Sequence, residues 1–467
     1  MDDFIFVLGS NWKLSLAELD TCLKSEPFKG KINDYSSNIA SVKFDNLVKR
    51  KHFVDDLETL QYYLGGTQKI AKIFDFFNIL TLKNAFPSKV ENFNEIKRER
   101  KKIKTILKNS IDKIFQKIED ENIFFVVSIY PNLFDDNYYR EILVKHFLPF
   151  LNKNISKILK EKNASKAIYF KYPEKNIDSG NLNPIFPHHV IKYELLKQNR
   201  AELVFAITEE GCYIGRTFTS DDPNFKRKID EQKPHKDFKS AISPKLAIMM
   251  LNFLNIFNDR HQKAILDPFV GNGTIALFAL LEDFKIYGSD IDKEKIDHTK
   301  RNIQWLQKEL EIPPILDLSN RFRIINIENL NNSFEAEYFD GIVTEPNLGP
   351  FYKEKPYYTE AMELFENKLE PLYNTIFEQA YDLLKSNCRI CIVAPSISLV
   401  DDKSDFRMDV QKIAIENNLT PISLISQKRI ANKSNELLQF RKQNLYSIMD
   451  TKEGQIIKRK IFVFEKT

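Results

Sequence analysis

The chain has little cysteine and no long apolar run, and each shortage excludes a class of protein. Its 467 residues contain 4 cysteines, too few for a disulfide framework at this length, which indicates a reducing compartment. No apolar stretch approaches the roughly 18 residues of a membrane-spanning helix. Acids, and not Lys or Arg, follow the first methionine, so we expect no signal peptide. The sequence therefore predicts a cytoplasmic protein with no membrane anchor.

A large surplus of charge and a metal-binding pattern are also missing. Lys and Arg number 69 against 65 Asp and Glu, so the partners of the chain depend on local patches more than on the net charge of +4. Histidine is scarce, at 7 residues. The single CxxC, at Cys388 and Cys391, lies in an alternating segment typical of a buried strand, and no second pair completes a zinc set. We expect no metal site.

Glycine is scarce too, but its placement is informative. Of the 13 glycines, Gly271 and Gly273 follow the apolar run that ends at Leu266 and precede an apolar helix. The segment from Ile265 to Asp292 therefore predicts a strand, a glycine turn, a helix and a second strand that ends in acids. Ligands of doubly wound sheets lie outside the carboxyl ends of the strands, so this turn is expected to approach a cofactor.

The acids at the turn favour one cofactor. Asp267 ends the first strand and would repel a pyrophosphate, the glycine spacing departs from GxGxxG, and no GxxxxGK[ST] loop occurs. S-adenosylmethionine fits better, because its amino group and sulfonium attract carboxylates. Its ribose needs an acceptor at the end of the next strand, where Asp290 stands. Thr274 is expected to start the following helix, and Asp292 to cap the helix after that.

Two further strands are expected to end at the same edge. FDGIVTEPNLGP places Glu345 directly after the apolar pair Ile342 and Val343. The run 321–327 brings Asn326 to the edge, where its amide suits an adenine ring.

Outside this region the chain divides by pattern. Strands mixed with amphipathic helices, including a long helix from Ile96 to Ile118, predict an α+β first half. The polar segment 220–236 lacks apolar periodicity and is expected to be a linker. Strands and helices alternate regularly after it, which predicts a doubly wound, largely parallel sheet. The predicted parts are residues 1–85, residues 86–219, the linker 220–236 and residues 237–467.

One face of the long helix is basic. Between Lys97 and Lys117, nine Lys or Arg stand against two acids. Such a run is usually a solvated helix face, and the alternative is a surface that binds phosphates. Further lysines at positions 153, 157, 160, 162, 166 and 171 strengthen the second interpretation. The residues expected to contact RNA are Lys97, Arg98, Arg100, Lys101 and Lys104.

The motifs together resemble one enzyme family. DPFVGNGT, GSDID and TEPNLGP are similar to the amino-methyltransferase pattern, in which a DPF[CV]GxGT loop binds S-adenosylmethionine and a [DN]PP[YF] loop orients an exocyclic amine. FVLGSNWKLSLAEL, LGGTQKIAKI, HHVIKYELL, CYIGRTF and PHKDFKSAISPKLAIMMLN resemble the THUMP-domain tRNA guanine-N2 methyltransferases of the archaeal and eukaryotic type. The resemblance covers most of the chain. It implies a ferredoxin-like domain, an RNA-binding THUMP domain and a Rossmann-like methyltransferase domain.

The resemblance also implies partners and site residues. tRNA is the expected partner, with a small activator protein as in some eukaryotic relatives. Glu345 and the carbonyl of Pro346, beside Asn347, would hold the target amine. Lys239 and Ser240 would stand near the methionine end of the cofactor. The remaining cofactor contacts implied are Asp267, Gly271, Gly273, Thr274, Asp290, Ile291, Asn326 and Ser243.

The loop TEPNLGP departs from the family pattern. Glu345 replaces Asp or Asn, and Leu348 stands where an aromatic ring would stack on a flipped base, a contact worth about 1–3 kcal/mol. Phe351, Tyr352, Tyr357 and Tyr358 follow closely and are candidate rings.

The expected function is S-adenosylmethionine-dependent methylation of a guanine N2 amine in tRNA. One alternative is methylation of adenine N6 in RNA or DNA, since this loop type serves several amines. Another is an RNA-binding homologue without activity, suggested by the altered loop. The last segment, EGQIIKRKIFVFEKT, is expected to be a strand whose basic side chains face RNA or water.

Overall fold

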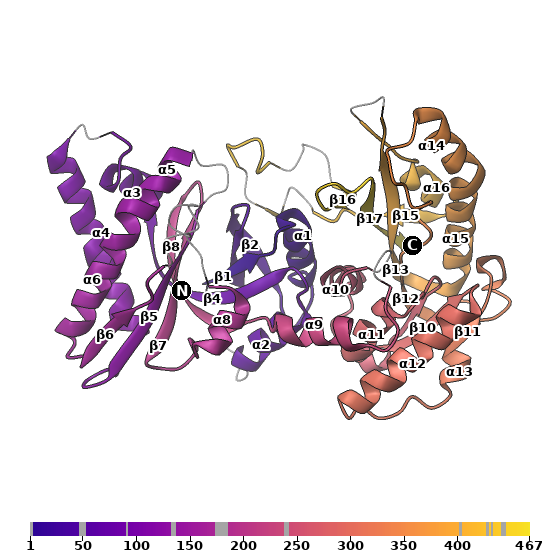
Figure 1. Ribbon diagram of the computed structural model, residues 1–467, viewed down its shortest axis with the longest axis horizontal. Coiled ribbons are helices and arrows are strands. Elements are labelled where there is room, and N and C mark those ends of the chain that lie inside the picture. The colour runs from indigo at the N-terminus through magenta and orange to yellow at the C-terminus, as the bar shows by residue number, and fades with distance from the viewer. Residues whose placement is uncertain are drawn as a thin grey trace.

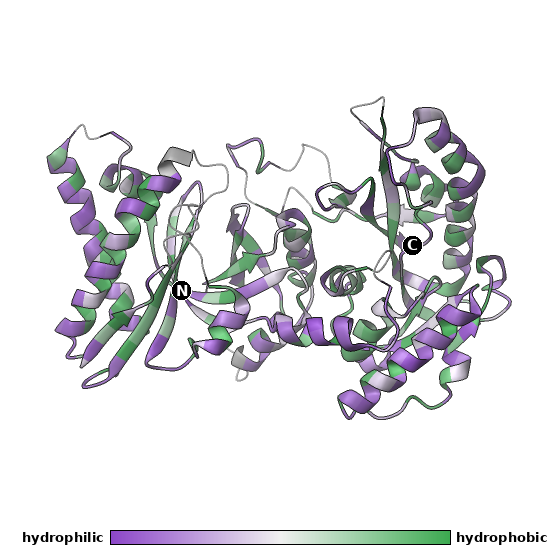
Figure 2. Ribbon diagram, viewed as in Figure 1, coloured by the Kyte–Doolittle hydropathy of each residue, from purple (hydrophilic) through white to green (hydrophobic). Residues whose placement is uncertain are grey.

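The computed structural model describes residues 3–45, 53–89, 92–131, 137–172, 185–237, 242–400, 404–425, 429–430, 433–439 and 445–467. The molecule has two halves, each a sheet with its helices, and they lie side by side along its longest axis (Figure 1). Each half is called a layer below. The strands of both sheets are mainly hydrophobic, whereas helices such as α4 and α12 are largely hydrophilic (Figure 2).

The first sheet runs in the order β2-β3-β1-β4-β8-β7-β5-β6. All its pairs are antiparallel except β5 with β7 and β5 with β6. Because β4 pairs with β8, the proposed parts 1–85 and 86–219 share this one sheet. Its strands are β1 Asp3–Leu8, β2 Gly30–Tyr35, β3 Ile39–Phe44, β4 Thr67–Asn78, β5 Asn122–Tyr130, β6 Lys166–Tyr169, β7 Arg200–Ile207 and β8 Gly211–Ser220.

Helices cover this sheet. The long basic helix α4 buries Ile103, Leu107 and Ile111 in one core with strands β5 and β7, and ends at Ile114, earlier than the expected Ile118. Ile118 is nevertheless buried beyond the helix end. The helices of this half are α1 Trp12–Cys22, α2 Phe53–Tyr63, α3 Ile79–Ala85, α4 Phe93–Ile114, α5 Asn137–Ile142, the π-helix η2 Leu143–Phe147, α6 Leu148–Glu161 and α8 Pro187–Lys192.

The predicted linker contains a helix, α9 Pro223–Gln232. Asp222 caps it by accepting hydrogen bonds from the backbone N–H groups of Asn224 and Phe225, and Pro223 occupies the first helical position. Ile229 is the apolar residue that it buries. One buried apolar position is too few to produce a periodic pattern, which is why the sequence showed none.

The second sheet confirms the predicted doubly wound, largely parallel arrangement. Its order is β11-β10-β9-β12-β13-β17-β15. The strands from β11 to β13 are mutually parallel, and β17 is antiparallel to β13. From β9 the chain continues outward through β10 and β11, then returns to the other side of β9 at β12, so the strand order reverses between β9 and β12. Such a switch point is where open α/β sheets bind ligands.

The elements of this half have the following bounds. The strands are β9 Ala264–Asp267, β10 Lys285–Asp290, β11 Phe322–Ile324, β12 Phe339–Thr344, β13 Leu384–Ser398, β14 Asp405–Phe406, β15 Leu419–Pro421, β16 Ser447–Asp450 and β17 Ile457–Lys466. The helices are α10 Pro244–Phe253, η3 Arg260–Gln262, α11 Thr274–Leu281, α12 Lys293–Glu309, α13 Leu318–Arg321, η4 Ile327–Asn329, α14 Tyr358–Leu364, the π-helix η5 Phe365–Leu369, α15 Glu370–Leu383 and α16 Val410–Glu416.

The two layers share a hydrophobic core. One cluster joins residues of β1, α1 and α2 to residues of α10, α11 and α12. At the closest approach, a Cβ atom on Gly65 would lie 2.4 Å from the carbonyl oxygen of Lys245, so only glycine fits there. The layers therefore meet through packed apolar side chains and a direct backbone contact. Within the described ranges, no helix is long and apolar enough to cross a membrane.

Candidate active site

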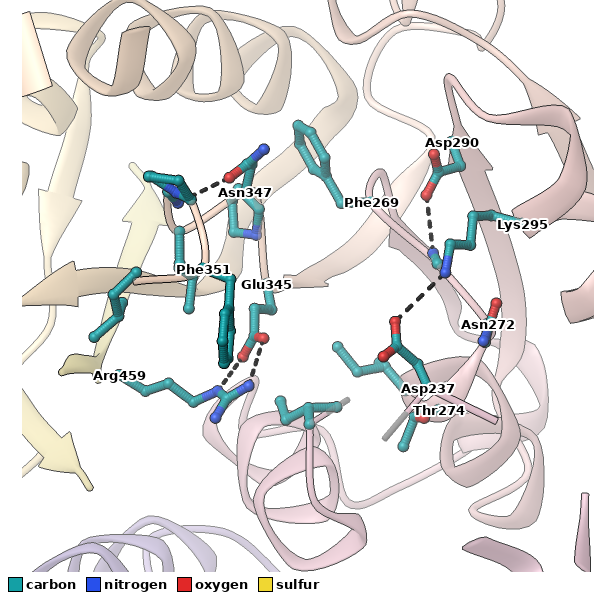
Figure 3. A pocket seen from close by; sticks show the side chains of 18 of the residues that line it. Asp237, Phe269, Asn272, Thr274, Asp290, Lys295, Glu345, Asn347, Phe351 and Arg459 are labelled. Atoms are coloured by element: carbon teal, nitrogen blue, oxygen red, sulfur yellow. Dashed lines mark hydrogen bonds and ion pairs between the residues drawn. The ribbon is translucent and has the colours of Figure 1, made fainter. Parts of the chain in front are cut away.

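A cavity of about 850 Å³ lies at the carboxyl ends of β9, β10 and β12. The loop between β9 and α11, the loop after β12 and the start of β17 contribute its walls (Figure 3). Because the strand order reverses between β9 and β12, the cavity occupies the switch point of the sheet. The predicted residues that line it are Asp267, Gly271, Thr274, Asp290, Ile291, Glu345, Pro346 and Asn347.

Asp290 holds the glycine turn in place. Its Oδ2 accepts a hydrogen bond from the Gly271 N–H at 3.0 Å, and its Oδ1 accepts one from the Asp292 N–H at 3.0 Å. Gly271 has a φ of +51°, and a Cβ atom there would meet nothing within 4 Å. The turn therefore faces open space at a position that a ligand can approach closely. As predicted, Thr274 is the first residue of α11 and Asp292 caps α12.

Asp267 is the most buried acid of the site, with 1% of the residue exposed. Its carboxylate accepts hydrogen bonds from the Thr344 hydroxyl at 2.8 Å and from the Phe269 N–H at 3.2 Å. Burial raises the pKa of Asp267 to about 7, and the charges of Asp290 and Glu345 act in the same direction. A cationic ligand in the cavity would favour the ionised carboxylate.

Glu345 follows β12 and forms an ion pair with Arg459 of β17. Arg459 donates from Nε to Oε2 at 2.6 Å and from Nη2 to Oε1 at 2.9 Å, and both residues line the cavity. Burial raises the pKa of Glu345, while the hydrogen bonds and charge of Arg459 oppose the rise. The expectation that every basic side chain of the last strand faces RNA or water was therefore wrong for Arg459.

The loop after Glu345 supplies an aromatic ring. The Asn347 side chain accepts a hydrogen bond from the Gly349 N–H at 2.8 Å, which closes the turn. Phe351 and Tyr352 line the cavity, and the Phe351 residue is 77% exposed. Tyr357 and Tyr358, the other two candidate rings, are absent from its lining. The candidate ring nearest to Leu348 in sequence is thus the one most available to a ligand.

Other lining residues were not predicted to belong to the site. Lys295 of α12 pairs with Asp237 at 3.4 Å, and Gly454, Gln455, Ile456 and Ile457 come from the turn before β17 and from its first residue. Asp237 directly follows the predicted linker, within the segment PHKDFKSAISPKLAIMMLN, but a single acid in a charged segment did not single it out. Residues from the start of β17 reach the site only through pairing of that strand with β13, which local patterns do not encode.

Some predicted site residues lie outside this cavity lining. The Asn326 side chain caps the short helix η4 by accepting a hydrogen bond from the Glu328 N–H. The Ser243 hydroxyl caps α10 by accepting a hydrogen bond from the Leu246 N–H. Gly273 directly precedes α11, and a Cβ atom on it would lie 2.9 Å from the Thr299 side chain. Lys239 and Ser240 lie outside the described residues. The roles predicted for these positions remain proposals.

The predicted RNA-binding residues on α4 are partly engaged within the fold. Arg98 pairs with Glu95 and Glu99, at 3.2 and 2.9 Å. Arg100 donates to the Ala85 carbonyl at 2.9 Å and lies over the Phe86 ring. The ammonium of Lys104 lies 5.7 Å from the Phe150 ring centre, whereas Lys97 and Lys101 are exposed.

A separate basic groove lies beside α6. Its volume is about 1100 Å³, and four lysines line it against one acid, Glu161. Tyr169 and Tyr172 add aromatic rings to its wall. The lysines of this groove are Lys153, Lys157, Lys160 and Lys171.

The chain is similar to known tRNA-modifying enzymes over part of its length. It is 30% identical over 190 residues to a tRNA (guanine(10)-N2)-dimethyltransferase of Methanothermobacter thermautotrophicus, a match that covers 39% of this chain and 49% of that protein. It is 25% identical over 153 residues to the enzyme of the same name from Pyrococcus abyssi, covering 32% of this chain and 41% of that protein. The matches therefore span about half the length of these relatives. No protein-family model matches the chain.

Among solved structures, TrmN from Thermus thermophilus aligns over the whole of both chains. The TM-score is 0.47 and the sequence identity 13%.

Proposed function

We propose that this protein is an S-adenosylmethionine-dependent tRNA methyltransferase that acts on the exocyclic N2 amine of a guanine. The observation that carries the proposal is the convergence of Asp267, Asp290 and Glu345 on one cavity at the switch point of the second sheet. The partial similarity to two enzymes named tRNA (guanine(10)-N2)-dimethyltransferase supports the substrate.

The site residues fit the cofactor chemically. Asp290, at the end of β10, offers carboxylate oxygens to the ribose hydroxyls, and Gly271 leaves space for the cofactor beside the turn. Asp267 faces the cavity with a carboxylate that a cationic amino or sulfonium group would keep ionised. When bound, S-adenosylmethionine supplies an electrophilic methyl group.

The chain's own contribution is to position the amine. The lone pair of an exocyclic amine is delocalised into the base, so hydrogen-bond acceptors must hold its two hydrogens while the nitrogen faces the methyl donor. Glu345 and the carbonyl of Pro346 are the proposed acceptors, and Asn347 shapes the turn that holds them. Alignment of the reacting atoms in this way lowers the barrier without covalent chemistry by the protein.

We propose that the first half holds the tRNA. Its ferredoxin-like part would comprise residues 1–85 and its THUMP part residues 86–219, followed by the linker 220–236 and the methyltransferase part 237–467. The basic groove beside α6 and the exposed lysines of α4 supply cations for phosphates. A small activator protein and a cytoplasmic location belong to the same proposal.

The test is methyl transfer from labelled S-adenosylmethionine to unmodified tRNA transcripts, followed by nucleoside analysis. We expect N2-methylguanosine as the product. Methyl groups found only on adenine would replace the base assignment with the N6 alternative. A protein that binds RNA but shows no cofactor binding by calorimetry would instead be the RNA-binding homologue without activity.

A further inference from the structure

The carboxylate of Glu345, in the loop after β12, accepts hydrogen bonds from Arg459 on both of its oxygens. The Glu345–Arg459 pair is bidentate and nearly enclosed, with 13% of the Glu345 side chain and 15% of the Arg459 side chain exposed. Phe351 lies beside the pair, and its ring faces the same cavity (Figure 3). The cavity therefore places an aromatic surface next to a fixed negative charge.

An ionised carboxylate has more acceptor capacity than this arginine uses. Its two oxygens offer about four lone-pair positions, and the bidentate contact takes the inward-facing one on each oxygen. The positions that remain point away from each other, so one oxygen receives both adjacent donors of guanine, N1–H and an N2 hydrogen. Adenine presents its N6 amine beside N1, which is an acceptor and is repelled by an ionised carboxylate. The charge on Glu345 therefore distinguishes the two bases.

We propose that the Glu345–Arg459 pair selects guanine over adenine. Glu345 accepts N1–H and an N2 hydrogen of the base, and Arg459 is the positioning residue that keeps the carboxylate ionised and oriented. Phe351 provides the stacking surface in place of Leu348. This inference rests on the proposed methyl-transfer function and names the feature of the site that sets its base specificity.

The surroundings of Glu345 explain why it needs the arginine. Burial and the charge of Asp450 raise its pKa, and Arg459 lowers it. Among the described residues, the other titratable groups that interact with Glu345 are Asp267, which is also acidic, and Tyr373, whose pKa burial raises well above its ordinary value. Without Arg459, the charged groups around Glu345 that the structure describes are negative, so the pKa of Glu345 would rise further. A protonated carboxyl donates a hydrogen bond and loses its match to guanine.

The first test is the pH dependence of methyl transfer by Arg459→Gln. We expect its single-turnover rate on unmodified tRNA transcripts to fall about tenfold for each pH unit below the raised pKa of Glu345, and to approach the wild-type rate at high pH. Arg459→Lys, which keeps the charge, should restore part of the rate near neutral pH. The matched control is Arg389→Gln. It removes a different Arg–Glu pair, in which Arg389 of β13 contacts Glu465 of β17 and the side chains are 18% and 21% exposed. It should keep the wild-type profile.

The second test is base selectivity in Glu345→Gln. The amide replaces one acceptor with a donor, so we expect slower methylation of guanine, independent of pH, and a higher ratio of methylated adenine to methylated guanine. Two results would overturn this inference and leave the proposed function in place. One is a rate of Arg459→Gln that is lower than the wild-type rate by the same factor at every pH. The other is an unchanged rate and base ratio in Glu345→Gln. A wild-type protein that methylates no guanine would overturn both.

Discussion

At the scale of single residues, the acids of the site could be predicted because each follows an apolar run. Asp267, Asp290 and Glu345 all end or follow buried strands of one parallel sheet, and the carboxyl ends of such strands share an edge. Arg459 could not be predicted, because it lies 114 residues after Glu345 and belongs to an antiparallel strand. Strand alternation tells which face a side chain occupies but not which residue it meets.

Asp290→Ala should weaken cofactor binding. Removal of the carboxylate takes away acceptors for the ribose and frees the Gly271 N–H, and hydrogen bonds to a charged group are worth about 1.5–3 kcal/mol. We expect the dissociation constant for S-adenosylmethionine, measured by calorimetry, to rise about tenfold to a hundredfold. Asp292→Ala is the control, since it removes only the cap of α12. An unchanged affinity in Asp290→Ala would contradict the proposed ribose contact.

Cofactor affinity should also depend on pH through Asp267. Its pKa is about 7 in the protein without ligand, so the carboxylate gains a proton as the pH falls through 7 and no longer attracts a cation. Calorimetry between pH 8 and pH 6 should show affinity falling toward the acidic end, by at most about tenfold per unit. Asp267→Asn should bind more weakly at pH 8 and lose most of this dependence. The same slope in both proteins would assign the titration to another group.

At the scale of elements, strongly periodic segments were predicted well and weakly periodic ones were not. The second sheet and helix α4 follow from long apolar patterns, but the end of α4 was placed four residues too late because Ile118 continues the apolar stripe beyond Ile114. The helix within the linker had a cap and a proline as its only local signals. Local patterns likewise did not show that β4 and β8 would pair and join the first two parts in one sheet.

The groove beside α6 should contribute more to RNA affinity than α4. Lys153→Gln with Lys157→Gln removes two cations that are one helical turn apart in the groove, and each phosphate contact contributes about 0.9 to the slope of log affinity against log salt. We therefore expect weaker tRNA binding and a salt slope reduced by about 2 in filter-binding titrations. Lys368→Gln with Lys412→Gln, which removes two exposed lysines elsewhere, controls for net charge. If the pair Lys97→Gln and Lys101→Gln has the larger effect, the phosphates lie on α4 instead.

At the scale of the whole molecule, the two layers are joined by buried polar contacts as well as by apolar packing. Glu18 of α1 accepts hydrogen bonds from the N–H groups of Gly65 and Gly66 and from the Asn252 side chain of α10, each at 2.8 Å. Arg260 pairs with Glu282 at 2.6 Å and lies 4.0 Å from the ring centre of Tyr63. Of these contacts, Glu18 with Asn252 and Arg260 with Tyr63 cross between the two layers. Their partners lie far apart in sequence, so local patterns could not predict them.

The layers should therefore unfold together. The chain has 2 tryptophans, Trp12 in α1 and Trp305 in α12, so Trp12→Phe and Trp305→Phe each leave one fluorescent probe in one layer. Urea titrations of the two variants should give coincident transitions. Asn252→Ala removes a partner of the buried Glu18, and should lower the free energy of unfolding by about 1–3 kcal/mol with either probe. Transitions that separate by probe would show that the layers unfold independently.

The contacts of the segment 429–450 have a practical consequence. Arg429 pairs with Asp20, and Lys433 with Asp34; the Tyr35 hydroxyl donates to the Leu438 carbonyl, and the Asn11 amide to the Met449 carbonyl. These residues lie between β15 and β17 in the sequence, yet their partners belong to the first half of the chain. Residues 237–467 expressed alone would expose Lys433, which is otherwise enclosed, and would lose the other three contacts. Residues 237–467 are therefore a poor candidate for separate production, and the chain should not be divided at either end of the linker.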